Sequence, residues 1–274
     1  MTTITATTSG YVSVNGLEMY YEVHGAAQPG ATPLVLLHGG ISTIETDFGR
    51  VLPTLAAGRQ VIGFETQAHG HTADIDRPIS FEQLADDVAA ALRQLGVDRV
   101  DVFGFSVGAG AALQLAIRHP ELIRKQIVAS GSYTHSGLHP QMAGGMENLQ
   151  PEMLYGTPFH EAYLRVAPDP TQWPALIARI KQMDSIVQDW PADDIRGITA
   201  PMLLIFGDSD IVQPEHAVEM FRLLGGGVPG DIVPMPNSQL AILPGTSHIG
   251  VMNQPEMLLA MVPRFLDAPM PGGA

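Results

Sequence analysis

Short apolar runs alternate with amphipathic stretches along most of the chain, and this alternation predicts its elements. Six runs have the length of strands that are buried on both faces, at 33–37, 60–64, 99–103, 126–129, 201–206 and 239–243. Apolar residues recur at helical spacing at 80–96, from the glycines after Phe103 through His119, at 215–224 and at 256–266. Strands that alternate with helices predict an α/β domain whose mostly parallel sheet is flanked by helices.

The start of the chain has a different pattern, in which apolar and polar residues alternate. Val12 and Val14 precede Asn15-Gly16, and the alternation continues from Leu17 to Val23. Asn-Gly between two alternating segments is a strong signal for a tight hairpin. We therefore expect two antiparallel strands at the start, which makes the predicted sheet eight-stranded.

The helix at 80–96 carries its own start and stop signals. Ser80 and Gln83 have the spacing of a capping box, in which each side chain binds the backbone N–H of the other residue. Apolar residues recur from Leu84 to Leu95, and Gly96 ends the helix.

Residues 134–195 break the alternation of strands and helices. The segment contains Met, aromatic and Pro residues and a helical patch at 176–183, but no apolar run typical of a buried strand. Long segments that lack the repeat pattern of their domain are commonly lids. We therefore predict a core formed by 1–133 and 196–274, with a helical cap inserted at 134–195.

Charge and cysteine content narrow the classes of function. The 274 residues suit one large domain, and the formal net charge of −14 arises from 28 acidic and 14 basic residues. Such a surface disfavours nucleic acid and anionic membrane as partners. The absence of cysteine excludes disulfides and thiolate chemistry. The Thr-rich start lacks the features of a signal peptide, and no stretch approaches the ~18 apolar residues of a membrane span, so the expected compartment is the cytoplasm.

The sharpest chemical motif is Gly104-Phe-Ser106-Val-Gly108, between a predicted strand and a predicted helix. In this setting a Gly-x-Ser-x-Gly turn strains the serine backbone and presents the hydroxyl above the sheet, near a helix N-terminus. Ser106 is therefore the predicted nucleophile. The alternative is that Ser106 only caps the following helix.

A serine hydroxyl needs a base to take its proton, and His248 is the candidate among ten histidines. It lies in a loop that is predicted to begin after Leu243, the end of the last strand. Catalytic groups in open α/β sheets gather at the carboxyl ends of strands. The alternative is a hydrogen-bonded loop histidine without a catalytic role.

The acid that orients the histidine should also follow a strand. Asp208 and Asp210 both do so, directly after the run 201–206. Their spacing does not separate them, and either could instead form the turn or cap the helix near Pro214.

His38-Gly39-Gly40 ends an early predicted strand. A backbone N–H of this loop, together with that of Val107, would form an oxyanion hole. Alone, the motif is typical of an ordinary glycine turn, and only the neighbouring motifs favour the oxyanion role.

These features together resemble the α/β-hydrolase family over nearly the whole chain. The shared elements are the opening hairpin, His38-Gly39-Gly40, the Ser106 turn, Gly207-x-x-Asp210 and His248, in the family's order of Ser, Asp and His. The resemblance implies that Asp210 rather than Asp208 is the acid, and that Gly40 donates to the oxyanion. It also implies a cap domain after the sixth strand, where the insertion falls.

One segment departs from the family pattern. Relatives often have Asp-x-x-Gly-x-Gly-x-Ser where this chain has Glu65-Thr-Gln-Ala68-His69-Gly70-His71-Thr72. Ala68 in place of glycine predicts a turn that is built differently. His69 and His71 flank a single glycine with no obvious further ligand, so we expect a structural or pocket-edge role and no bound metal.

The nucleophile narrows the reaction that the resemblance implies. Relatives that open epoxides or remove halides have an aspartate in the place of Ser106, proline iminopeptidases differ at Ile41 and Val107, and haloperoxidases often have an aromatic residue at Gly40. The expected activity is therefore that of a carboxylesterase without a cofactor, acting through an acyl-enzyme on Ser106. A lactonase, a perhydrolase or haloperoxidase, a carbon–carbon bond hydrolase or lyase, and a catalytically silent binding protein stay open as alternatives.

The cap and the loops of the site supply candidate pocket residues, which predict a modest apolar substrate. The candidates are Gly39, Ile41, Met153, Tyr155, Phe159, Trp173, Ile211 and Ile249. The expected partner is a small-molecule ester, and a homodimer is left open.

Overall fold

The computed structural model describes residues 6–142, 146, 148–185 and 188–270. Its centre is one eight-stranded sheet with the order β1-β2-β4-β3-β5-β6-β7-β8. Pairing is antiparallel between β1 and β2 and between β2 and β4, and parallel between all other neighbours. The prediction of a mostly parallel eight-stranded sheet is confirmed.

The strands are β1 (Thr8–Val14), β2 (Leu17–His24), β3 (Leu34–Leu37), β4 (Val61–Glu65), β5 (Val100–Phe105), β6 (Ile123–Ala129), β7 (Met202–Ser209) and β8 (Gln239–Ser247). The helices are α1 (Ile44–Phe48), α2 (Leu52–Gly58), α3 (Phe81–Gln94), α4 (Val107–Arg118), α5 (Pro158–Val166), α6 (Trp173–Ser185), α7 (Ala192–Arg196), α8 (Pro214–Leu223) and α9 (Pro255–Asp267). Short 3-10 turns join several of them.

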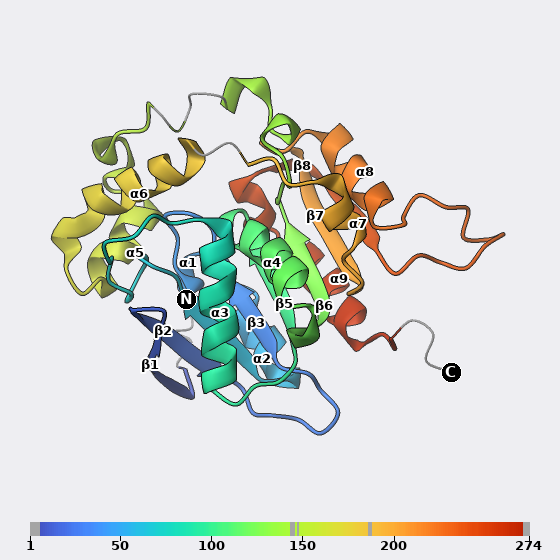
Figure 1. The fold of residues 1–274 in the computed structure, drawn as a ribbon, viewed down its shortest axis with the longest axis horizontal. Coiled ribbons are helices and arrows are strands. Elements are labelled where there is room, and N and C mark those ends of the chain that lie inside the picture. The colour runs from blue at the N-terminus through green and yellow to red at the C-terminus, as the bar shows by residue number, and fades with distance from the viewer. Residues whose placement is uncertain (1–5, 143–145, 147, 186–187, 271–274) are drawn as a thin grey trace.

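Both faces of the sheet are buried, and successive residues of a strand contribute to opposite faces. In β3, Leu34 and Leu36 pack with side chains of α1, α2 and α9, whereas Val35 and Leu37 pack with α3 and α4. In the view of Figure 1, α3 and α4 lie in front of the sheet. Because both faces need apolar side chains, the central strands have the continuous apolar runs seen in the sequence.

The opening hairpin is confirmed. Val14 pairs with Leu17, and the two residues between them, Asn15 and Gly16, have φ values of 49° and 84°. A tight two-residue hairpin turn requires positive φ at both central positions, and Asn-Gly is the sequence best suited to it.

The last two strands are longer than their apolar runs predicted. β8 continues through Ser247, so the predicted loop from Leu243 to His248 is wrong. Ser209 of β7 pairs with Ser247 of β8 after a register shift, and this pairing continues the strands into polar sequence. Pro244 is compatible with the strand because β8 is at the edge of the sheet.

The capping box at the start of α3 is only half formed. Ser80 accepts a hydrogen bond from the Gln83 backbone N–H at 3.2 Å, as predicted. The Gln83 side chain, however, donates to Asp87 Oδ1 at 3.1 Å instead of binding back to Ser80. Asp87 lies one turn further along the helix, and its carboxylate is a strong acceptor for the side-chain amide N–H of Gln83.

The segment between β6 and β7 contributes no strand to the sheet among its described residues. It contains α5, α6 and α7, and Figure 1 shows α5 and α6 together at one end of the molecule. The predicted helical patch at 176–183 lies inside α6 and is confirmed. Isolated bridges pair Thr134 with Asp189 and Leu138 with Val212, and so join this segment to itself and to the loop after β7. Its division from the core at 134 and 195 stays a prediction.

Within the described ranges, no helix combines the length and the apolar character that a membrane crossing requires.

Candidate active site

Ser106 lies in the turn between β5 and α4, with φ 54° and ψ −114°. Two close approaches of the backbone explain the glycines that flank it. A Cβ at Gly104 would overlap the carbonyl oxygen of Gly108, and a Cβ at Gly108 would overlap that of Leu37 at the end of β3. The motif therefore locks the strained turn against the loop that follows β3.

The structure brings Ser106, Asp210 and His248 into one chain of hydrogen bonds. His248 Nε2 lies 3.0 Å from Ser106 Oγ, and His248 Nδ1 lies 2.7 Å from Asp210 Oδ1. The three residues directly follow β5, β7 and β8, whose carboxyl ends lie at the same edge of the sheet. This arrangement can move a proton from a serine hydroxyl to a histidine that a buried carboxylate orients.

The structure separates the two aspartates that spacing left open. Asp208 is exposed, and its carboxylate accepts from the backbone N–H groups of Gly245 at 2.8 Å and Thr246 at 3.0 Å. These bonds lower the pKa of Asp208 and hold β8 against β7. Asp208 therefore stabilises the strand pair, and Asp210 is the carboxylate in contact with His248.

Asp210 is 4% exposed and is held by groups from several segments. Ser130, after β6, donates to Asp210 Oδ2 at 2.5 Å, and the Gly207 N–H donates to the same oxygen at 3.2 Å. Burial alone would raise the pKa of Asp210, but the bonds from His248, Ser130 and Gly207 outweigh it and lower the pKa below its usual value. Asp210 is therefore ionised near neutral pH.

The loop after β3 presents three successive backbone N–H groups, of which the outer two are hydrogen-bonded. The Gly39 N–H donates to Asp47 Oδ2 at 2.7 Å, and the Ile41 N–H donates to His69 Nε2 at 3.1 Å. Within the described residues, neither the Gly40 N–H between them nor the Val107 N–H has an acceptor. A Cβ at Gly40 would lie 3.2 Å from Val107 Cγ2, so the two free groups come from adjacent segments. Two such donors beside a nucleophile are what an oxyanion hole needs.

Asp47 anchors this loop from inside the core. It is 5% exposed, and burial raises the pKa of its carboxyl, while the Gly39 N–H and the neighbouring His38 act in the opposite direction. His38 contributes further, because its Nδ1 lies 2.8 Å from the Gly39 carbonyl and its Nε2 accepts from the Thr66 N–H at 3.2 Å.

Non-glycine residues in the left-handed region gather around the site. Five of the described residues other than glycine have positive φ, and four of them belong to the segments just described: Ile41 at 60°, Ala68 at 67°, Ser106 at 54° and Ser130 at 54°. Ala68 thus takes a conformation that glycine favours, and a difference between its turn and that of relatives stays a prediction.

The candidate pocket residues lie in different environments. Gly39 and Ile41 are in the loop after β3, Ile211 follows Asp210, and Ile249 follows His248. Phe159 packs against the core cluster that includes α6, and Trp173 is 1% exposed with its Nε1 donating to the Pro151 carbonyl. Met153 and Tyr155 are 67% and 52% exposed on the surface of the segment between β6 and β7. Substrate contact by each of these residues stays a prediction.

Ile180 of α6 lies next to Gly40 and was not among the candidates. Its Cδ1 would be 3.6 Å from a Cβ placed on Gly40. Helical spacing of Trp173, Leu176, Ile177, Ile180 and Met183 could have predicted a buried face of α6. What this face contacts depends on tertiary structure, and the sequence carries no signal for it.

His69 and His71 are occupied by protein groups. His69 uses both ring nitrogens, for the Ile41 N–H and for the Gln67 carbonyl, and His71 Nδ1 lies 2.7 Å from Glu65 Oε2. Among the residues that the structure describes, no group of three or more His, Asp or Glu side chains is placed to hold a metal ion.

Comparisons with known proteins agree with this architecture. The family model described as alpha/beta hydrolase fold matches residues 32–172. An uncharacterized hydrolase of Bacillus subtilis, YugF, is 24% identical over 93% of this chain and 96% of its own length. Among solved structures, the enol-lactonase from Burkholderia xenovorans has a TM-score of 0.71 and 20% identity, over 94% of this chain and 100% of that one. The meta-cleavage product hydrolase CumD from Pseudomonas fluorescens has a TM-score of 0.72 and 15% identity, over 96% and 98% of the two chains.

Proposed function

This chain belongs to the α/β-hydrolase family, and we propose that it is a carboxylesterase that cleaves a small carboxylic ester through an acyl-enzyme on Ser106. The observation that carries the proposal is the continuous chain of hydrogen bonds from Asp210 through His248 to Ser106. The free N–H groups of Gly40 and Val107 supply the oxyanion hole that ester cleavage also needs.

The proposed reaction begins when His248 Nε2 takes the proton of Ser106 as Oγ attacks the ester carbonyl. The electrons of the carbonyl double bond move to its oxygen, which accepts hydrogen bonds from the Gly40 and Val107 N–H groups. Asp210 stabilises the imidazolium. The bond to the alcohol oxygen then breaks, His248 returns the proton to that oxygen, and the acyl group stays on Ser106.

A water molecule completes the proposed cycle. His248 takes a proton from the water as the water attacks the acyl-enzyme, and the second tetrahedral intermediate uses the same oxyanion hole. The bond to Ser106 Oγ breaks, and His248 returns the proton to Oγ. The products are the carboxylic acid and the free enzyme, and no cofactor takes part in any step.

We also propose that residues 134–195 cap this site and limit the size of the substrate. The support is the position of Ile180, whose side chain lies beside Gly40 although it belongs to α6. An apolar residue next to an oxyanion donor favours a small apolar acyl group over a charged one.

A substrate panel with the Ser106→Ala variant tests the proposal. We expect wild type to hydrolyse p-nitrophenyl acetate, short aryl esters or small lactones, and Ser106→Ala to lose at least about 10⁴-fold in kcat. A fluorophosphonate probe should label wild type and not the variant. Turnover of lactones alone would replace the carboxylesterase by a lactonase, and turnover of carbon–carbon substrates alone would replace it by a carbon–carbon bond hydrolase. The absence of all turnover together with an unreactive Ser106 would contradict a serine hydrolase altogether.

A further inference from the structure

His69 contacts the loop of the proposed oxyanion hole from a buried turn. The residue is 1% exposed and lies in the segment that follows β4. Its Nδ1 is 2.8 Å from the Gln67 carbonyl oxygen, and its Nε2 is 3.1 Å from the Ile41 nitrogen. A carbonyl can only accept and an amide N–H can only donate, so the ring carries its proton on Nδ1 and accepts at Nε2.

This acceptor is available across the range in which an esterase works. Burial, with a smaller contribution from the neighbouring His38, lowers the pKa of His69 to about 3. Protonation of Nε2 would remove the acceptor and place a second donor against the Ile41 N–H. The neutral ring is thus a permanent acceptor, unlike a surface histidine that changes state near neutral pH.

The N–H that His69 binds belongs to a strained residue. Ile41 has a φ of 60°, which is unfavourable for a β-branched side chain and persists only where neighbouring groups enforce it. The Gly39 N–H, on the other side of Gly40, is held by Asp47. Gly40 therefore lies between two anchored neighbours, and the direction of its own free N–H follows from theirs.

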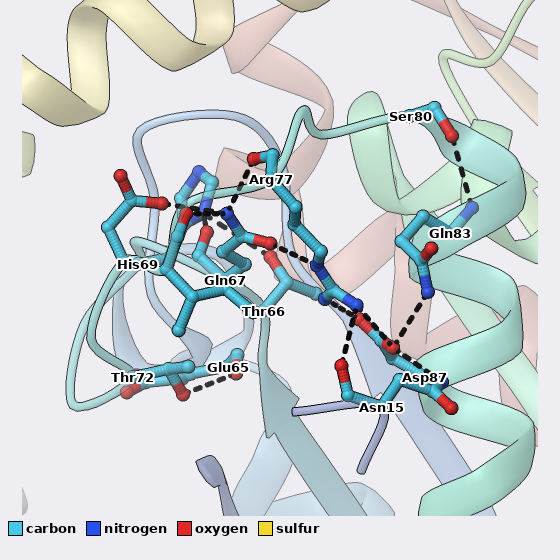
Figure 2. A network of polar contacts seen from close by, with 12 residues as sticks. Asn15, Glu65, Thr66, Gln67, His69, Thr72, Arg77, Ser80, Gln83 and Asp87 are labelled. Carbon is cyan, nitrogen blue, oxygen red and sulfur yellow. Dashed lines mark hydrogen bonds and ion pairs between the residues drawn. The ribbon is translucent and has the colours of Figure 1, made fainter. Parts of the chain in front are cut away.

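The turn that carries His69 is itself fixed to the core, as Figure 2 shows. Gln67 Nε2 donates to Asp74 Oδ1 at 2.7 Å and to the carbonyls of Ile75 and Arg77, and its Oε1 accepts from Arg77 Nε at 2.6 Å. Arg77 in turn forms an ion pair with Asp87 of α3. Connected hydrogen bonds of this kind, centred on the buried Gln67, make the turn rigid, so His69 has a defined position from which to hold the loop.

We propose that His69 is a positioning residue for the oxyanion hole, which aims the Gly40 N–H by binding the N–H of the next residue. The role rests on the proposed serine hydrolase activity. His69 itself touches neither the substrate nor the nucleophile. Loss of its bond to the Ile41 N–H should therefore lower kcat and leave ground-state binding nearly unchanged.

Two substitutions of His69 separate its two hydrogen bonds. In His69→Gln the longer side chain carries an acceptor near the Nε2 position, and in His69→Asn the amide can serve the Gln67 carbonyl but is too short to reach Ile41. We expect His69→Asn to lower kcat for p-nitrophenyl acetate about 10- to 100-fold with KM within about three-fold, and His69→Gln to recover most of the rate. His71→Asn, the same change two residues along the turn, should stay near wild type, because His71 contacts Glu65 and not the loop.

The inhibition constant of a transition-state analogue distinguishes the positioning role from a general loss of stability. A trifluoromethyl ketone adds to Ser106 and forms an oxyanion, so its inhibition constant should rise in His69→Asn by about the same factor as kcat/KM falls. Equal kcat and equal inhibition in wild type and a folded His69→Asn would overturn the proposal. So would a fall of the same size in His69→Gln and His71→Asn.

Amide hydrogen exchange in the wild-type protein tests the bond without any substitution. The Ile41 amide should exchange slowly and the Gly40 amide quickly, because only the first has an acceptor. Equally fast exchange of both would overturn the positioning role even if His69→Asn failed to fold. If the proposed hydrolase activity itself is wrong, the wild-type protein will neither cleave esters nor react with a fluorophosphonate. This outcome is distinct from failure of the positioning role, in which the wild type is active.

Discussion

The sheet and the segment between β6 and β7, which we propose as a cap, contribute to the site in different ways. In the core, each proposed catalytic group directly follows a strand, and its place results from the topology of the sheet. Its partners are buried groups from distant parts of the chain, as Ser130 is for Asp210. The segment between β6 and β7 instead places one side chain of α6, Ile180, beside Gly40, and Arg179 of the same helix donates to Asp74.

This difference separates two properties of an enzyme. Under the proposed function, the reaction depends on atoms that the sheet and its loops hold, whereas the choice of substrate depends on side chains of the proposed cap, such as Ile180 beside Gly40. Substitutions in the core should therefore change the rate for all esters alike. Substitutions in the cap should change the order in which esters are preferred.

The strongest test of the core is the exchange of Asp210 for asparagine. Asp210→Asn keeps the shape of the side chain but removes the charge that stabilises the imidazolium, so kcat should fall about 10⁴-fold for every ester. Asp208→Asn is the matched control, because it lies two residues away and its carboxylate accepts from the backbone of β8 and from the Ser209 hydroxyl, not from His248. Similar losses in steady-state assays of both variants would contradict the assignment of the acid.

The pH dependence of stability tests whether the core keeps His69 neutral. The folded-state pKa of about 3 lies below the ordinary histidine value of 6.5, so the unfolded chain takes up a proton that the folded chain does not take up as the pH falls. This contribution to stability is complete above pH 6.5 and declines toward pH 3. Between pH 7 and pH 5, wild type should lose about 2 kcal/mol more than His69→Gln in urea unfolding. Parallel curves for the two proteins would show that the buried ring accepts a proton.

The cap is tested by Ile180→Ala. The shorter side chain opens space beside Gly40, so the ratio of kcat/KM for p-nitrophenyl hexanoate to that for the acetate should rise about 10-fold. Ile177→Ala is the control, since Ile177 is equally buried on α6 but is not among the nearest atoms to the Gly40 position. Because both kcat/KM values come from the same enzyme sample, their ratio does not depend on the fraction of protein that is folded. An equal change in both variants would mean that α6 affects selectivity only through its packing.

The smallest expected effect concerns the attachment of the cap. Arg179 Nε donates to Asp74 Oδ2 at 2.8 Å and its Nη2 donates to the Ile75 carbonyl at 2.9 Å, with both charged side chains mostly buried. Arg165 pairs with Glu45 on the surface. Arg179→Met should lower the free energy of unfolding by about 1 kcal/mol more than Arg165→Met does. Thermal or urea unfolding of the two variants measures this difference. Equal losses of unfolding free energy would contradict a larger contribution of the Arg179 contacts.

The parts of the site that the sequence could predict are those that backbone sterics dictate. The Gly-x-Ser-x-Gly turn is readable because side chains at Gly104 and Gly108 would overlap carbonyl oxygens. The hairpin is readable because Asn15 and Gly16 tolerate positive φ. Such local requirements restrict residue type strongly, so a pattern of residues is enough to locate them.

The parts that the sequence could not predict depend on partners far along the chain. Spacing gave no choice between Asp208 and Asp210, because the choice rests on which carboxylate meets Ser130 and which meets the backbone of β8. The length of β8 was missed for a related reason, since its pairing with β7 continues where apolar residues end. Ile180 and His69 likewise depend on how α6 and the turn after β4 lie against the loop that holds Gly40.

The strained residues around the site also bear on how this protein could evolve. Ile41, Ala68, Ser106 and Ser130 all have positive φ, and each such residue typically costs about 1 kcal/mol or more of a total stability of about 5–15 kcal/mol. A lineage carrying these residues has little reserve for further destabilising mutations in the loops of the core. New substrate preferences should therefore arise through changes in the side chains of α6, while the strained loops change slowly and only after compensating changes elsewhere.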